Sequence, residues 1–248
     1  MSFIVFILGT IVGSFLNVCI YRIPNGVSIS YPPSHCYACD TKLKALDLIP
    51  LLSFVFLRGR CRYCKAKFSV RYPMIEALTG LLFLGVFWKF DLEWETIKYL
   101  IFTSYLIVVT FIDFDHMVIV DSTNIVAVVL GLPFLVIGDL RGNFVESILG
   151  ILLGAGIIAI IRFISRGGMG DGDIFLMGVV GFYLGYKMLP LQFMLTLVFA
   201  SVISILLIVF KIKSRKDYIP FGPFIAIGAW VTLIWGNDIL NWYTKLLF

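Results

Sequence analysis

The chain has 248 residues, of which 60% are hydrophobic and only 14% are charged, and its mean hydropathy is +1.00. This composition excludes an ordinary soluble domain and is typical of a protein that crosses a membrane several times. The net charge of +5 is modest, and topology and anionic lipid account for the basic residues, so no nucleic-acid partner is expected.

Eight apolar segments follow one another along the chain. The first covers residues 2–21, has no small-residue cleavage site and continues directly into a polar stretch. We therefore expect a retained helix, with a removed signal peptide as the alternative. The other segments cover residues 74–90, 96–112, 124–138, 144–161, 174–189, 191–210 and 224–243. The predicted fold class is an all-α polytopic membrane protein with about eight transmembrane helices.

The basic residues are distributed unequally between the two sets of loops that eight spans would create. Fifteen lie in one set: Arg22, Lys42, Lys44, Arg58, Arg60, Arg62, Lys65, Lys67, Arg71, Arg162, Arg166, Lys211, Lys213, Arg215 and Lys216. Five lie in the other: Lys89, Lys98, Arg141, Lys187 and Lys245. Because cytoplasmic loops carry the excess of lysine and arginine, the first set is predicted to be cytoplasmic and both termini external.

A polar insertion over residues 22–73 separates the first two apolar segments. It contains two Cys-x-x-Cys pairs, Cys36 with Cys39 and Cys61 with Cys64, with 21 residues between the pairs. Four thiolates in this spacing predict a structural zinc site with no open coordination position. Two disulfides are the alternative, which a reducing cytosol disfavours. Cys19 lies inside the first apolar segment and is expected to be a buried small side chain.

Two aspartates stand where an apolar segment meets a cytoplasmic loop, Asp113 after the third segment and Asp173 before the sixth. Carboxylates beside hydrocarbon are costly and indicate function. Two that come together can share a proton and activate water, which is the chemistry of peptide hydrolysis. Asp115 is a rival to Asp113, and Asp121 could be a helix N-cap.

The second aspartate closes a Gly-x-Gly-Asp motif at residues 170–173. The glycines at 170 and 172 would allow a close backbone approach and a positive φ, which would place Asp173 at the start of the next helix. The motif alone is weak evidence, because a glycine-rich stretch can also be a flexible turn. The chain has only two histidines, so neither a serine–histidine–aspartate triad nor a histidine-rich metalloprotease motif competes.

Several motifs along the chain resemble those of the type IV prepilin leader peptidase/N-methyltransferase family, membrane aspartic proteases with a Gly-x-Gly-Asp motif. The N-terminal motifs are Gly-Ser-Phe-Leu-Asn-Val at 13–18 with Arg22 and Pro24, residues 34–39, Asp-Leu-Ile-Pro at 47–50, Arg-Gly-Arg-Cys at 58–61, and Arg-Tyr-Pro at 71–73 with Glu76. The C-terminal motifs are Ile-Asp at 112–113 with Asp121, residues 170–173, and Pro-Phe-Gly-Pro-Phe at 220–224.

The resemblance implies that Asp113 and Asp173 form the catalytic pair. It implies cleavage of the short basic leader of prepilins or pseudopilins, followed by N-methylation from S-adenosylmethionine, in a multi-pass protein of the bacterial cytoplasmic membrane whose active site faces the cytoplasm. It further implies a methyltransferase-associated region at 1–95 and a six-helix peptidase domain at 96–248. The chain contains no recognisable glycine fingerprint for an adenosyl group, so no residue is assigned to that cofactor.

Three alternatives stay open from the sequence. A carboxylate-relay transporter would use the same two aspartates, although carrier sites gather near the membrane midplane. A scaffold would use the zinc insertion to bind a cytosolic partner and would not need the aspartates. A third alternative is a peptidase without methyltransferase activity. The sequence makes no prediction of the oligomeric state.

Overall fold

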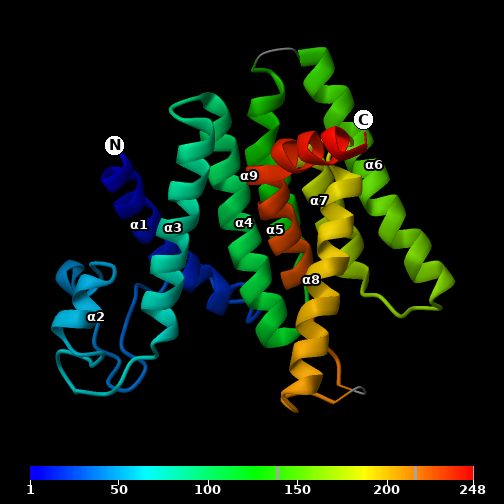
Figure 1. Ribbon diagram of the computed structural model, residues 1–248. Helices are drawn as coiled ribbons and strands as arrows, with labels where there is room; N and C mark the ends of the chain where they lie inside the picture. The colour runs from blue at the N-terminus through cyan, green and yellow to red at the C-terminus, as the bar shows by residue number, and fades with distance from the viewer. Residues whose placement is uncertain (138–139, 215–216, 248) are drawn as a thin grey trace. The chain divides into compact units, whose positions relative to one another are not determined.

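The computed structural model describes residues 1–137, 140–214 and 217–247, and this part of the chain is helical and contains no strand. Its elements are α1 (Ser2–Arg22), η1 (Ala45–Asp47), α2 (Leu52–Phe56), α3 (Arg71–Phe90), α4 (Trp94–His116), α5 (Asp121–Gly131), η2 (Leu132–Leu135), α6 (Leu140–Ile164), α7 (Asp171–Leu184), α8 (Leu189–Val209) and α9 (Gly222–Leu247) (Figure 1). The predicted segment end at Gly138 and the loop residues Arg215 and Lys216 lie outside the described residues.

Each of the eight predicted apolar segments forms a helix. Within the described ranges, six helices are long and apolar enough to cross a membrane, namely α1, α3, α4, α6, α8 and α9. The helix α5, which η2 extends to Leu135, and the 14-residue helix α7 are shorter. At a rise of 1.5 Å per residue α7 is about 21 Å long, less than the hydrocarbon thickness of about 30 Å. The all-α polytopic class is confirmed, and two of the eight expected spans are these shorter helices.

The chain forms two compact units, Met1–Thr96 and Ile97–Phe248. In the first unit α1 and α3 run side by side (Figure 1). Glycines of α1 permit this close contact, because a Cβ on Gly9 would lie 2.7 Å from the Cα of Gly80 and a Cβ on Gly13 would lie 2.8 Å from the Cα of Glu76. Close approach of two apolar helices through small residues is the usual packing inside a membrane.

In the second unit α6 and α7 pack closely through a pair of glycines (Figure 1). A Cβ on Gly150 would lie 2.1 Å from the carbonyl oxygen of Gly181, so both positions need a residue without a side chain. The hydroxyl of Ser147 donates to the carbonyl of Phe182 at 3.0 Å, which adds a hydrogen bond across the same interface. The position of α7 is therefore fixed along its length by α6.

Tyrosines connect α7 and α4 to α5. The hydroxyl of Tyr183, on α7, donates to the carbonyl of Ala127 on α5 at 2.7 Å, and its ring stacks on Phe102 of α4 with centroids 4.6 Å apart. The hydroxyl of Tyr105, also on α4, donates to Oδ1 of Asn124 on α5 at 2.7 Å. Buried hydroxyls need such partners in an apolar interior, so these bonds select one arrangement of the three helices.

Candidate functional site

Asp113 lies in the last turn of α4 and is buried, with 5% of the residue exposed. Its Oδ2 accepts a hydrogen bond from the backbone N–H of Gly222, the first residue of α9, at 2.9 Å. A Cβ on Gly222 would lie 2.7 Å from the same oxygen. Residue 222 must therefore be glycine for the start of α9 to reach this carboxylate. The positive end of the α9 dipole favours a negative charge at this position.

Asp173 is the third residue of α7 and is also buried, at 8% exposed. Its Oδ2 accepts the backbone N–H of Gly170 at 3.2 Å, which caps the helix. Two aspartates that are 60 positions apart in the sequence are thus both buried at helix ends, Asp113 in the last turn of α4 and Asp173 in the first turn of α7.

The neighbouring acids have a different environment. Asp115 is exposed, although it lies only two residues from Asp113. Asp121 is exposed at the first position of α5, and the N-cap of that helix is Val120, so the alternative interpretation of Asp121 as the N-cap is wrong. Asp171 is exposed and pairs with Arg162. Burial therefore separates Asp113 and Asp173 from the other acids in these loops.

The glycine-rich loop before α7 departs from one expectation. The left-handed backbone conformations lie at Arg166 and Gly167, with φ of 53° and 90°, whereas Gly170 has φ of −69°. The predicted positive φ at the motif glycines is therefore wrong for Gly170, and Gly172 does not adopt it either. The predicted close approach is correct, because a Cβ on Gly172 would lie 2.7 Å from the Cβ of Ile119.

The first cysteine pair forms a compact turn. The N–H of Cys36 donates to the carbonyl of Thr41 at 3.0 Å, and the N–H of Asp40 donates back to the carbonyl of Cys36 at 2.8 Å. Asp40, the residue after Cys39, has a positive φ of 53°, which turns the chain sharply after the second thiol. Backbone hydrogen bonds within a few residues thus direct both sulfurs of the pair to one side.

The second cysteine pair repeats this geometry. The N–H of Cys61 donates to the carbonyl of Ala66 at 2.8 Å, and the N–H of Lys65 donates to the carbonyl of Cys61 at 3.1 Å. Lys65, which follows Cys64, also has a positive φ, at 62°. The two pairs are therefore two copies of one local structure, called knuckles below: residues 35–42 and residues 60–67, each closed by an isolated β-bridge between its end residues.

The four sulfurs of the knuckles converge, and all lie within 4.8 Å of one another. The Sγ atoms of Cys36 and Cys64 are 3.7 Å apart. A tetrahedral zinc ion with Zn–S bonds of about 2.3 Å requires sulfurs about 3.8 Å apart, so the donor set and its spacing fit zinc. The four thiols are not joined in disulfides, and Cys19 is buried in α1, away from this set, as expected.

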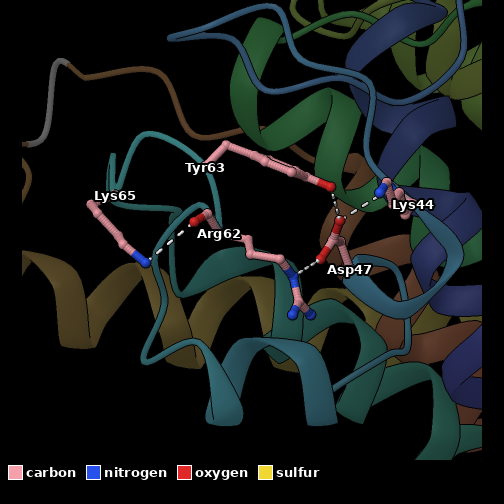
Figure 2. Close-up of polar contacts among 5 residues, drawn as sticks. All are labelled: Lys44, Asp47, Arg62, Tyr63 and Lys65. Carbon is pink, nitrogen blue, oxygen red and sulfur yellow. Dashed lines mark hydrogen bonds and ion pairs between the residues drawn. The ribbon is translucent and has the colours of Figure 1, made fainter.

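Asp47 connects the loop between the knuckles to the second knuckle (Figure 2). Its side chain is 3% exposed; Oδ1 accepts from Nε of Arg62 at 2.6 Å, and Oδ2 accepts from the hydroxyl of Tyr63 at 3.2 Å and from the N–H of Lys44 at 3.1 Å. Burial by itself would raise the pKa of Asp47, but these hydrogen bonds lower it below the usual value. Arg62 and Tyr63 are the two residues between the second pair of cysteines, so Asp47 orients that pair.

A shallow pocket on α9 is unrelated to either cluster. It is lined by Val231, Trp235, Asp238, Ile239 and Trp242. These residues follow Gly222 by 9 to 20 positions, which is about 13–30 Å along the helix. The pocket therefore lies well away from the carboxylate of Asp113.

Comparison with known proteins identifies the family of the chain. Residues 7–90 match the bacterial peptidase A24 N-terminal domain, and residues 100–209 match the type IV leader peptidase family. The chain is 34% identical to the prepilin leader peptidase/N-methyltransferase of Aeromonas hydrophila, over 97% of this chain and 92% of that protein. The chain belongs to the type IV leader peptidase family. The corresponding protein of Bacillus subtilis (strain 168) is 33% identical over 98% of both chains. No solved structure shows a significant match.

The family matches include both clusters: the cysteines lie in the N-terminal region and both aspartates lie in the leader peptidase region. The sequence did not predict that Gly222 contacts Asp113 or that Asp47 contacts the second knuckle. Gly222 belongs to a motif that the sequence shows, yet its contact with Asp113 depends on how α9 packs. Asp47 also belongs to a motif, and its place as one of only two acids in a basic insertion was the available signal for an ion pair with a knuckle.

Proposed function

We propose that this chain hydrolyses the peptide bond between the short basic leader and the apolar helix of prepilins or pseudopilins, with Asp113 and Asp173 as the catalytic pair. The observation that supports this most strongly is that Asp113 and Asp173, from different helices, are both buried at the ends of those helices. Family membership supplies the reaction class, and the relatives are named as peptidases that also transfer a methyl group.

The proposed mechanism uses one proton shared between two carboxylates. In this scheme the two carboxylates meet, and because two adjacent negative charges disfavour each other, one carboxylate is ionised while its partner keeps a proton. The ionised group removes a proton from water as the water attacks the scissile carbonyl, and the protonated group donates to the developing oxyanion. The N–H groups of Gly222 and Gly170 hold the two carboxylates in place during these proton transfers. No covalent intermediate forms in this scheme.

The proposed membrane orientation follows from charge. Asp113 and Asp173 flank loops that belong to the set with fifteen basic residues, so the catalytic pair faces the cytoplasm of a bacterial cytoplasmic membrane. The basic leader of the substrate then stays in the cytosol while its apolar helix lies in the bilayer. The scissile bond is held at the level of the lipid headgroups, where the ends of α4 and α7 carry the carboxylates.

We also propose that the first unit carries the methyltransferase half, approximately residues 1–95, and that residues 96–248 form the peptidase domain. The four cysteines Cys36, Cys39, Cys61 and Cys64 hold a structural zinc ion, which fixes the fold of the insertion and supplies no open coordination position for chemistry. The methyl donor is S-adenosylmethionine by family analogy. No residue of this chain is assigned to it, and no step of the hydrolysis runs through it.

A mass measurement on purified protein and a prepilin tests the proposal. The wild-type protein removes the leader, and added S-adenosylmethionine then adds one methyl group to the shortened product. Asp113→Asn and Asp173→Asn each abolish cleavage, while the matched control Asp115→Asn, in the same helix turn but exposed, retains it. Full cleavage by either catalytic variant would refute the proposal. Leader loss without methylation would support the peptidase alone.

Purified protein and prepilin also distinguish the peptidase from the transporter and the scaffold. A transporter would show ion flux in reconstituted vesicles and no change in the mass of the prepilin. A scaffold would bind a cytosolic partner through the insertion and would tolerate both aspartate substitutions. Burial of both carboxylates at helix ends, rather than in the middle of long spans, favours the peptidase.

A further inference from the structure

The short helix α2 exposes a continuous apolar face. Leu52, Val55 and Phe56 are 55%, 69% and 80% exposed, and their spacing of three and four residues places them on one side of the helix. Phe54 points elsewhere, since its ring packs where a Cβ on Gly59 would be, 2.8 Å away. No residue of α2 is buried. An exposed apolar face on a polar insertion indicates a binding surface for a membrane or for another protein segment.

A buried carboxylate fixes the position of α2 relative to α3. Oε2 of Glu76 accepts the backbone N–H of Leu51, the N-cap of α2, at 2.8 Å, and Glu76 is 8% exposed. Glu76 lies five residues after the start of α3, which is about 7.5 Å along the helix axis. The 20 residues of α3 span about 30 Å, the thickness of the hydrocarbon core. The start of α2 is therefore attached to α3 within the first two turns of that helix.

Two arginines after α2 are placed where they could contact lipid headgroups. Arg58 and Arg60 follow the helix directly, and both are exposed. Apolar side chains beside arginines are the pattern of a segment that lies in the interface of an anionic membrane. Val70, just before α3, and Met74, in its first turn, also expose apolar side chains.

We propose that α2 is an interfacial anchor whose apolar face, Leu52, Val55 and Phe56, inserts into the boundary between headgroups and acyl chains of the same bilayer that α1 and α3 cross. Arg58 and Arg60 bind anionic lipid headgroups beside it. The anchor holds the four-cysteine insertion against the membrane surface at the depth set by the bond from Leu51 to Glu76. This role is independent of the catalytic assignment of the aspartates.

Fluorescence quenching of the full-length protein in vesicles tests the anchor. Phe56→Trp adds an emission signal on the apolar face, and Tyr37→Trp adds a matched signal on the first knuckle, where the parent side chain is 67% exposed. Lipids brominated on their acyl chains should quench the signal added by Phe56→Trp at least twofold more than the signal added by Tyr37→Trp. Aqueous acrylamide should show the opposite order. Equal quenching of the two by either agent would overturn the proposal.

Two further variants separate the anchor from a protein-binding face. In the Phe56→Trp background, Glu76→Gln keeps an acceptor for the N–H of Leu51 and should preserve quenching by brominated lipid, whereas Glu76→Leu removes the acceptor and should reduce it. Replacing phosphatidylglycerol by phosphatidylcholine should also reduce it. Shielding from acrylamide that develops only when prepilin is added would show that the face binds a protein segment, and the proposal would be wrong.

Discussion

The four-cysteine cluster and the proposed aspartate pair both involve residues that are distant in the sequence, but they depend on different kinds of contact. Each half of the cysteine cluster is a knuckle closed by its own backbone bonds within eight residues, such as that from Cys36 to Thr41. The N–H of Gly170 caps Asp173 locally, but in the described part of the chain no bond within a few residues positions Asp173 against Asp113. Asp113 depends on α9, through Gly222, and Asp173 depends on the packing of α7 against α6 and α5.

This difference teaches where each site is vulnerable. A knuckle should keep its form when distant helices are altered, because its bonds are local. The aspartate pair should fail when a remote helix end moves by about 1 Å, since proton transfer requires closely positioned groups. The following variants test this contrast.

The largest effect is expected for Gly222→Ala. Its Cβ would lie 2.7 Å from Oδ2 of Asp113, so either α9 or the carboxylate must move. We expect leader cleavage to fall by about 100-fold or more, the cost of misplacing a reacting group by about 1 Å. The rate of cleavage of a prepilin, followed by mass, checks this, and the zinc content should be unchanged. The control is Gly156→Ala in α6, where a Cβ meets no atom within 4 Å. Equal activity of the two variants would contradict the role of Gly222.

Cys61→Ser should remove most of the bound metal. One of four thiolates is lost from a site whose sulfurs lie within 4.8 Å of one another, and metal binding stabilises the local fold. We expect the zinc content, measured by elemental analysis, to fall well below one ion per chain and the insertion to become sensitive to protease. Cys19→Ala, in α1, is the control and should retain zinc. Unchanged zinc in Cys61→Ser would refute the four-cysteine site.

Asp47→Asn should produce an intermediate effect on the metal. The neutral side chain weakens the ion pair with Arg62 at 2.6 Å, so the second knuckle loses part of its support while all four ligands stay (Figure 2). We expect zinc release to a chelator to become about tenfold faster, as for other groups that orient metal ligands. Asp40→Asn is a matched control, since Asp40 is exposed and asparagine tolerates its positive φ. The same release rate in both variants would show that Asp47 does not support the knuckle.

Tyr183→Phe should have the smallest effect. It removes the bond of 2.7 Å to the carbonyl of Ala127 while keeping the ring stacked on Phe102. We expect the free energy of unfolding to fall by about 1 kcal/mol, with little change in zinc content. A denaturant titration in detergent measures this, with Tyr218→Phe, at a residue 84% exposed, as the control. A loss equal to that of the control would show that this bond does not stabilise α7.

The sequence predicted the helices well because long apolar runs have few alternatives in a membrane. It did not predict that α7 would have only 14 residues, because the apolar run continues past Leu184 while Gly185 ends the helix with a positive φ. It also placed a positive φ at the motif glycines, whereas the turn is made earlier, at Arg166 and Gly167. A glycine-rich stretch offers several positions for a turn, and packing selects among them.

The sequence by itself determined the membrane class, the two cysteine knuckles and the aspartates as candidates, because hydropathy, ligand spacing and charge near hydrocarbon are properties of short segments. Only the tertiary structure decided that Asp113 is buried and Asp115 is exposed, that Gly222 donates to Asp113, and that Glu76 attaches α2 to α3. These outcomes depend on which helix ends meet. That choice is made by the packing of side chains over the whole unit, which no local pattern records.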